Sequence, residues 1–547
     1  MFTVAILIGI YSYIIFTIGL LGLLYKQVIL FSTLVFFIFC VVLFKKQIKY
    51  SIKWITRFFT RSILVKAIQG YSLKRLSFLL LSLLIIQSLI NLIGALGPEL
   101  GFDALWYHLT LPKIYLLNHA IVHIPGGLLY YSDMPKLTEM LYTASLVFDN
   151  AILAKLVHFS FGILTCLAIY KLSRKFLNNK LSLIAVVIFY SNLVVGWQSI
   201  TAYIDLTRTF FELMALWGFI NFWEKGKKKW LIESAVMLGL AISTKLLAVG
   251  SLFIFTVLIY YSFAKAKKKL SDIVTSILVY WWLAVLVSLP WFIFSFIHTG
   301  NPVYPFFTNI YPVSFNFNLF NPINFIKEMW TFFTNLADPI SPLYLIFLPF
   351  AIIYFRKFHP LLKMISIYSF LAIILWYFTP RTGGGRFILP YLPALSIVVA
   401  GTINEFIKNK YLYRLSIILV IITAFLSIGY RGFANVKYLP VILGKQSKAN
   451  FLENRLNFSF GDFYDTDEYF RKNIKKSDIV LLYGFHNLYY VNFPFVDSSW
   501  VKKGDVFNYI ATQNTTLPKR FSYWNLVYRN SKTHVNLYSL GGQKWVY

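Results

Sequence analysis

Cysteine and charge are both scarce in this sequence. Only Cys40 and Cys166 occur among 547 residues, and both lie inside apolar segments, which excludes a disulfide framework and a thiol-based metal site. Charged residues make up 13% of the chain, which is about half the share that is usual in a soluble protein. The first residues lack the basic start and the small-residue cleavage site of a signal peptide, so we predict a first helix that is retained.

The sequence does contain long apolar runs. Apolar residues make up 58% of the chain and aromatic residues 19%. Runs of this kind, about 18 residues or longer, are typical of membrane-spanning helices. We predict an all-α polytopic membrane protein with about thirteen spanning helices. The predicted spans are 3–24, 28–44, 76–96, 150–170, 181–197, 205–223, 231–246, 247–263, 271–297, 341–355, 362–378, 387–407 and 412–430. The stretch 231–263 is too long for one helix and short for two.

The net charge of +31 is concentrated in short loops between the predicted helices. The connection 45–75 carries nine Lys or Arg and no acidic residue, so the positive-inside rule places it in the cytoplasm. Alternating helices then bring the other basic loops to the same side, at 171–180, 224–230, 264–269, 356–363 and 408–414. The positive charge therefore marks the cytoplasmic side of the membrane. Its expected partner is anionic membrane lipid rather than nucleic acid. We expect a multi-pass plasma-membrane protein whose N-terminus is cytoplasmic.

The same topology divides the chain into three regions. Residues 1–75 form an N-terminal transmembrane hairpin with its basic cytoplasmic connector, and 76–430 form the main transmembrane domain. The main domain has outer loops at 97–149 and 298–340. Residues 431–547 have a soluble composition and form a small extracytoplasmic α/β domain. In that domain the apolar run 477–495 is typical of a buried strand followed by a turn.

An aspartate stands at the outer end of a long apolar helix. Asp103 follows an uncharged run from 76 to 98 and has aromatic neighbours on both sides. An ionisable residue at a membrane boundary costs free energy, which indicates a function, and a carboxylate there could take a proton from a hydroxyl group. Alternatively, Asp103 only caps a short helix whose face carries Asp103, Tyr107 and Leu111.

Two further carboxylates fall on the same outer side. Glu139 is either a second carboxylate of the site or part of a capping box that begins at the turn of Lys136. Asp205 begins an apolar helix and either contributes to the site beside Asp103 or forms a local ion pair with Arg208.

Three cations also face outward, against the general distribution of charge. Lys245 ends GLAISTK (239–245), while Arg381 and Arg386 flank three glycines. The arginines and the free backbone amides could cradle a phosphate, or the arginines could anchor lipid headgroups. His119 and His123 have the spacing of helical metal ligands. Glycines at 126–127 follow closely and disfavour a helix there, so we interpret His119 and His123 as interfacial histidines. No metal ligand is predicted and no cofactor is assigned, although a divalent cation stays an option.

Several motifs of the chain resemble those of membrane glycosyltransferases of the GT-C superfamily. The similarity is strongest to the family 39-like group, which contains the protein O-mannosyltransferases and the aminoarabinose transferase of lipid A. The motifs are, in order, FDALWYHLTLPKIYL (102–116), SDMPKLTEMLY (132–142), GLAISTK, PWFIFSFIHTGNPVYPFF (290–307) and GRFILPYLP (385–393). The resemblance covers 76–407.

The resemblance implies an inverting transfer of a monosaccharide from a polyprenyl-phosphate donor to an extracytoplasmic lipid, glycan or protein acceptor. Asp103 falls on the family's catalytic aspartate, which acts as general base. Arg386, Lys245 and Arg381 fall where the family holds the donor phosphate, and Asp103's neighbours Tyr107, His108 and Lys113 are expected to bind substrate.

The chain departs from the family pattern in two ways. Asp103 follows the third predicted helix instead of the first, and Ala104 stands where a second acid is common. This leaves Glu99, Glu139 or Asp205 as the partner of the base. The alternative function is a polytopic transporter or flippase of lipid-linked sugars, which would predict an internal repeat and polar residues at mid-membrane depth. The sequence shows no clear repeat.

Overall fold

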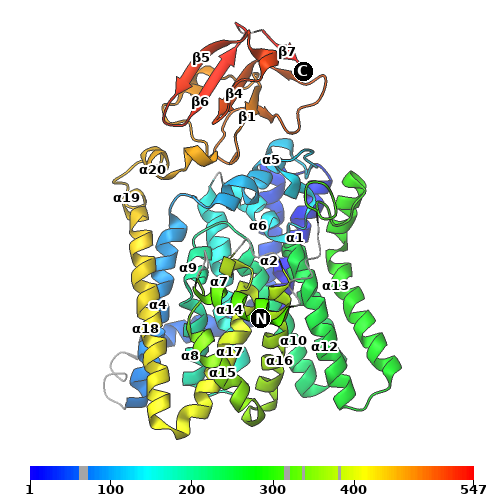
Figure 1. The fold of residues 1–547 in the computed structure, drawn as a ribbon, viewed down its shortest axis with the longest axis vertical. Helices are drawn as coiled ribbons and strands as arrows, with labels where there is room; N and C mark the ends of the chain where they lie inside the picture. The colour runs from blue at the N-terminus through cyan, green and yellow to red at the C-terminus, as the bar shows by residue number, and fades with distance from the viewer. Residues whose placement is uncertain (61–71, 149, 313–320, 335–338, 380–383, 542) are drawn as a thin grey trace.

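The computed structural model describes residues 1–60, 72–148, 150–312, 321–334, 339–379, 384–541 and 543–547. The chain forms a tall helical body. A small β-rich unit, the C-terminal unit, contains all the strands from residue 480 onward and is stacked on one end of the helical body (Figure 1). The helices are α1 (Phe2–Leu20), α2 (Lys26–Thr60), α4 (Ser72–Leu96), α5 (Thr110–Asn118), α6 (Leu137–Leu146), α7 (Ala151–Ser173), α8 (Asn179–Tyr190), α9 (Leu193–Gln198), α10 (Asp205–Lys225), α11 (Lys228–Thr244), α12 (Ser251–Lys265), α13 (Leu270–Thr299), α14 (Pro322–Thr334), α15 (Leu343–Tyr354), α16 (Pro360–Tyr377), α17 (Leu392–Glu405), α18 (Lys410–Asn435), α19 (Leu439–Ile442), α20 (Lys448–Arg455) and α21 (Tyr469–Asn473).

Each predicted span corresponds to helical structure, but not every one is a long apolar helix. Within the described ranges, nine helices are long and apolar enough to cross a membrane. The four predicted spans outside this set correspond to α8 with α9, α10, α11 and α15. Of these, α10 carries Asp205, Arg208 and Glu212, all fully buried in protein. A polar helix is tolerated at such a place because other helices, rather than lipid, surround it.

The doubtful stretch 231–263 contains two helices. Helix α11 ends at Thr244, Lys245 has an extended backbone, and a 3-10 turn over Leu246–Gly250 leads into α12. The break turns Lys245 out of the helical path and into a cavity.

Helix α10, which is buried along most of its length, packs closely against α11. A Cβ atom on Gly218 would lie 2.9 Å from the backbone of Ser234, so only glycine permits this approach. Small residues at helix contacts are the usual basis of helix association in membranes. On another side of the body, α18 runs beside α4 (Figure 1).

The C-terminal unit contains a five-stranded mixed sheet of order β2-β1-β4-β6-β5 and a two-stranded sheet of β3 and β7. In the larger sheet β1 is parallel to β2 and β4, whereas β6 is antiparallel to β4 and β5. The buried strand expected within 477–495 is confirmed as β1. The strands are β1 (Val480–Tyr483), β2 (Phe495–Asp497), β3 (Val506–Phe507), β4 (Tyr509–Gln513), β5 (Asn525–Asn530), β6 (Val535–Ser539) and β7 (Trp545–Val546).

The C-terminal unit packs directly on the segment that follows α4. The Nζ of Lys113 donates to the carbonyl oxygens of Tyr489 (2.7 Å) and Val491 (2.5 Å). Gly126 has a φ of 91°, and a Cβ atom there would lie 1.9 Å from the carbonyl oxygen of Ser499. The aromatic rings of Phe102 and Trp106 also contact His486. These contacts hold the backbone on both sides of Asp103.

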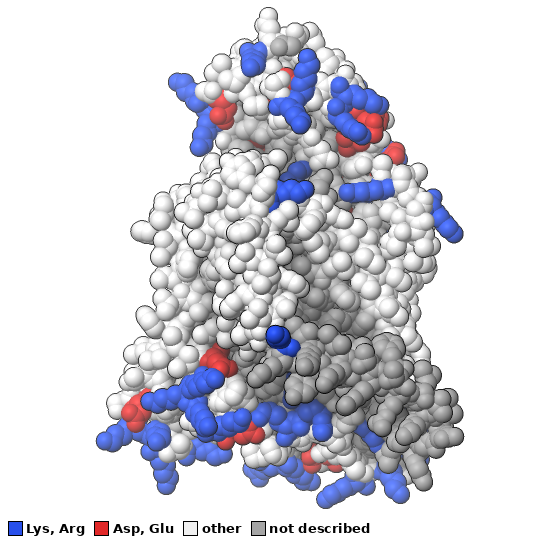
Figure 2. Space-filling view, turned by 180° about the vertical axis from the view of Figure 1, so that it is seen from behind, with Lys and Arg blue, Asp and Glu red and all other residues white. Residues whose placement is uncertain are grey.

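Charged side chains gather at the two ends of the molecule. Figure 2 shows a dense set of Lys and Arg at the end far from the C-terminal unit and a broad belt between the ends with few charges. An uncharged belt bounded by charged ends is the surface that a bilayer requires. The structure is therefore that of a multi-pass membrane protein.

Candidate functional site

A cavity of about 260 Å³ brings together ionisable residues from four parts of the chain. They come from the π-helical turn after α4, the start of α6, the break after α11, and the segment before α17. Aromatic rings, including those of Trp106 and Tyr131, line much of the remaining wall. The acidic and basic lining residues are Asp103, His108, Lys136, Glu139, Lys245 and Arg386.

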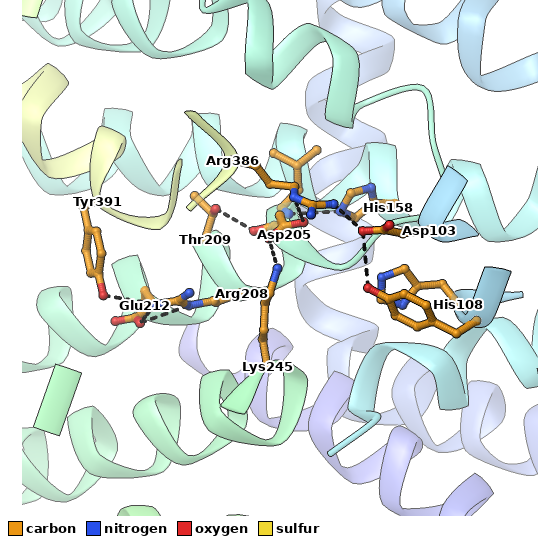
Figure 3. A network of polar contacts seen from close by, with 12 residues as sticks. Asp103, His108, His158, Asp205, Arg208, Thr209, Glu212, Lys245, Arg386 and Tyr391 are labelled. Carbon is orange, nitrogen blue, oxygen red and sulfur yellow. Dashed lines mark hydrogen bonds and ion pairs between the residues drawn. The ribbon is translucent and has the colours of Figure 1, made fainter. Parts of the chain in front are cut away.

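Asp103 forms an ion pair with Arg386. Its Oδ2 accepts a hydrogen bond from Nη1 of Arg386 at 2.5 Å and a longer one from the hydroxyl of Tyr107 at 3.3 Å (Figure 3). In the part of the chain that the structure describes, Oδ1 has no hydrogen-bond partner. Asp103 precedes the turn Ala104–His108 but makes no side-chain capping bond, so the capping interpretation is wrong. The carboxylate faces the cavity with one oxygen available.

Arg386 also faces Asp205, and Asp205 in turn binds Lys245. The Nε of Arg386 lies 3.9 Å from Oδ2 of Asp205, and the Nζ of Lys245 donates to Oδ1 at 2.6 Å. Negative and positive groups therefore alternate from Asp103 through Arg386 and Asp205 to Lys245 (Figure 3). The predicted local pair of Asp205 with Arg208 is wrong, because Arg208 instead pairs with Glu212 at 3.3 Å.

A buried histidine orients the turn from which Asp205 projects. His158 on α7 is fully buried, with Nδ1 2.9 Å from the carbonyl oxygen of Thr201 and Nε2 accepting from the amide of Leu206 at 3.0 Å. These partners assign a neutral imidazole with its proton on Nδ1. The same turn carries Tyr203, whose hydroxyl accepts from the amide of Asp103 at 3.0 Å. The sequence contains no spacing that would have identified His158.

Glu139 pairs with His108 on another wall of the cavity. The distance from Oε1 of Glu139 to Nδ1 of His108 is 2.8 Å, and both side chains are buried. The second oxygen, Oε2, is buried without a partner in the structure as described. The capping-box interpretation of Glu139 is wrong because the residue that precedes α6, Lys136, makes no capping bond.

Lys136 is a cavity residue to which sequence reasoning assigned no function. Its side chain is 2% exposed and lines the cavity. Among the described residues its ammonium makes neither an ion pair nor a hydrogen bond. Burial lowers the pKa of Lys136, although Glu139 and Asp133 act in the opposite direction. It thus differs from Lys245 and Arg386, which are each already paired with a carboxylate.

Tyr107 lines the cavity next to Asp103. Burial raises the pKa of its phenol well above the ordinary value, and the charge on Asp103 adds to the effect. The hydroxyl is therefore protonated and serves as a donor to Asp103. A substrate-binding role for Tyr107 and His108 stays a prediction.

The remaining predicted residues lie elsewhere. Lys113 contacts the C-terminal unit through Nζ and lines two neighbouring cavities instead of this one, so a substrate-binding role for Lys113 stays a prediction. The carboxylate of Glu99 accepts from the backbone amides of Leu100, Gly101 and Ala202, which makes it a backbone anchor rather than the partner of Asp103. Arg381 lies outside the described residues.

The two histidines with metal-ligand spacing point to different neighbours. His119 has a left-handed backbone and stacks on Tyr25 at 4.0 Å between ring centroids, whereas Nδ1 of His123 lies 2.7 Å from Oδ2 of Asp133. Across the described ranges, no three His, Cys, Asp or Glu side chains are placed to hold one metal ion.

Comparisons with known proteins show what the chain as a whole resembles. Residues 141–294 match the family model described as dolichyl-phosphate-mannose-protein mannosyltransferase. None of the curated proteins matches the chain.

Among solved structures, the chain is similar to ArnT from Cupriavidus metallidurans bound to undecaprenyl phosphate. The two are 13% identical with a TM-score of 0.53, and the match covers 86% of this chain and 98% of that chain. The apo structure of the same protein gives 10% identity and a TM-score of 0.54, covering 84% and 97%. At these identities the likeness shows a shared fold, which agrees with the fold expected from the sequence.

Proposed function

We propose that this chain, a membrane glycosyltransferase of the GT-C type, transfers a monosaccharide from a polyprenyl-phosphate donor to an acceptor hydroxyl on the outer side of the membrane. The observation that carries the proposal is the contact between Asp103 and Arg386 in one cavity. Glycosyl transfer from a phosphate needs a base for the acceptor hydroxyl and positive charge on the departing phosphate. The two residues supply these requirements side by side.

The proposed reaction is a direct displacement at the anomeric carbon. The acceptor oxygen forms a bond to that carbon, its proton passes to Oδ1 of Asp103, and the bond from the carbon to the phosphate oxygen breaks. The electron pair leaves with the polyprenyl phosphate. Because the acceptor enters opposite the leaving group, the configuration at the anomeric carbon inverts.

The cations of the cavity are proposed to hold the donor phosphate. Arg386 and Lys245 come from separate segments, and Lys136 adds an ammonium with no carboxylate partner within the described residues. The structure of ArnT with undecaprenyl phosphate, a relative in fold, supports this class of donor. The basic end of the molecule in Figure 2 supports a cytoplasmic position for that end and an outer position for the C-terminal unit.

The test is transfer by the purified protein with Asp103→Asn as the variant. We expect the variant to fold and to bind undecaprenyl phosphate, because asparagine can still accept from Arg386. Transfer of radiolabelled sugar from polyprenyl-phosphate donors should fall by about 10²–10⁴-fold, the usual contribution of a general base. Full activity in the variant would remove Asp103 as the base. Movement of lipid-linked sugar across vesicles without a glycosylated product would favour the flippase.

A further inference from the structure

A ring of buried hydrogen bonds lies deeper in the helical body than the proposed reaction site. Arg208 donates to Oε1 of Glu212 (3.3 Å) and to the hydroxyl of Tyr391 (3.0 Å). Ser251 donates to the same Oε1 at 2.9 Å, and its oxygen lies 3.2 Å from the Tyr391 hydroxyl. Since the proton of Ser251 is used on Glu212, Tyr391 donates to Ser251. The four residues close a ring, and each is exposed by 2% or less.

Three members of the ring are each close in sequence to one charged residue of the group Asp205, Lys245 and Arg386. Arg208 follows Asp205 by one turn of α10, Ser251 begins α12 six residues after Lys245, and Tyr391 follows Arg386 by five residues. In Figure 3 Arg208, Glu212 and Tyr391 lie beside the group of Asp205, Lys245 and Arg386, on the side away from Asp103. One ring therefore joins the three segments that carry the charged group.

A buried ion pair is an expensive way to stabilise a fold. Removing two charges from solvent costs free energy that their attraction does not always recover, and apolar residues of similar size often serve as well. The buried pair of Arg208 and Glu212 therefore adds little net stability to the fold. Its hydrogen bonds, however, have fixed directions. Directional hydrogen bonds between three segments fix the position of each segment relative to the other two.

The segment of Arg386 has the greatest need of such an anchor. Two 3-10 turns, Gly384–Arg386 and Leu389–Tyr391, connect this residue to α17. A 3-10 turn has weaker hydrogen bonding than an α-helix, so local structure alone holds the guanidinium loosely. The Tyr391 hydroxyl is the point at which this segment is tied to both α10 and α12.

We propose that Tyr391, through its contacts with Arg208 and Ser251, is a positioning residue that sets the place of Arg386 in the cavity. It does not touch the substrate. The inference rests on the proposed function, in which Arg386 binds the donor phosphate.

A double-mutant cycle on lipid-phosphate binding tests the inference. Wild type, Tyr391→Phe, Arg386→Gln and the double variant are compared in lipid nanodiscs, with undecaprenyl phosphate as the probe. Tyr391→Phe keeps the aromatic side chain and its packing but removes the hydroxyl, which opens the hydrogen-bond ring. We expect it to weaken binding about ten-fold in the presence of Arg386, and less than about two-fold when residue 386 is glutamine, because coupled residues are non-additive.

Tyr344→Phe is the matched control. Tyr344 is also a fully buried tyrosine, and its hydroxyl contacts Asn192 and Ser396 instead of the members of the ring. This variant should bind the lipid phosphate like wild type. If Tyr391→Phe does not fold, Ser251→Ala opens the ring by removing the bonds that Ser251 makes with Tyr391 and Glu212, and it should show the same coupling to Arg386.

The outcomes separate this inference from the proposed function. Equal losses in both Arg386 backgrounds would mean a general structural effect and would overturn the positioning role, as would an equal loss in the Tyr344 control. Wild-type binding by Tyr391→Phe together with weak binding by Arg386→Gln overturns this inference alone. Wild-type binding by Arg386→Gln overturns the phosphate role of Arg386 and the inference with it.

Discussion

Arg386 and Asp103 are 283 residues apart in the sequence, yet Nη1 of one donates to Oδ2 of the other at 2.5 Å. The same guanidinium faces Asp205, so Arg386 is shared between two carboxylates. In the proposed reaction, a donor phosphate competes with Asp103 for the hydrogen bonds of Arg386. Donor binding would thereby loosen the contact that holds the base and leave Asp103 free to accept the acceptor proton.

Replacing Lys136 by methionine should weaken donor binding. The ammonium lines the cavity with no carboxylate partner among the described residues, and a hydrogen bond to a charged group contributes about 1.5–3 kcal/mol. Binding of undecaprenyl phosphate should therefore fall by about ten- to hundred-fold. Lys437→Met is the control, because Lys437 lies over the ring of Tyr438 and outside the cavity. Unchanged binding in Lys136→Met would show that the phosphate lies against other cations.

Breaking the contact between Asp205 and Lys245 should cost stability as well as activity. In this 2.6 Å pair Asp205 is buried and Lys245 is half-buried, and removal of one partner costs up to about 3–5 kcal/mol because the other charge loses its nearest counter-ion. Asp205→Asn and Lys245→Met should each lower the unfolding temperature in detergent. The double variant should be less destabilised than the sum of the two, since neither charge is then isolated. Strict additivity would contradict a direct interaction.

Stability of the C-terminal unit should depend on pH through Asp497. This residue ends β2, and burial raises the pKa of its carboxyl from 3.8 to about 6. The folded state therefore favours the protonated form of Asp497. The stability that this carboxyl contributes is complete below about pH 4 and is lost as the pH rises through about 6. The loss corresponds to about 3 kcal/mol.

Hydrogen exchange of the β1 and β2 amides in the full chain measures this effect. Asp497→Asn should protect them better than wild type at pH 7, because the amide oxygen can still accept from Ser499. The two proteins should agree near pH 4, which is the internal control. A wild-type protein with the same protection at pH 4 and pH 7 would refute the prediction.

The helical body and the key carboxylate were predictable because their signals are local. Apolar runs of membrane length identify helices one at a time, and the position of Asp103 beside such a run marks it as unusual. Asp205 shows the limit of this reasoning, because the sequence left open whether it pairs with Arg208 or contributes to the site. Spacing along one helix favours that pair, but Lys245 comes from a different helix and lies closer to the carboxylate.

The sequence by itself determined that this is a multi-pass membrane protein and that Asp103 lies at the end of a span, since hydropathy and loop charge act along the chain. Only the tertiary structure decided the partners. It joined Asp103 to Arg386, assigned Glu139 to His108, turned Lys113 toward the C-terminal unit and brought Lys136 into the cavity. The physical reason is that electrostatic and hydrogen-bond partners are selected by distance in space. That distance depends on helix packing, which sequence spacing does not encode.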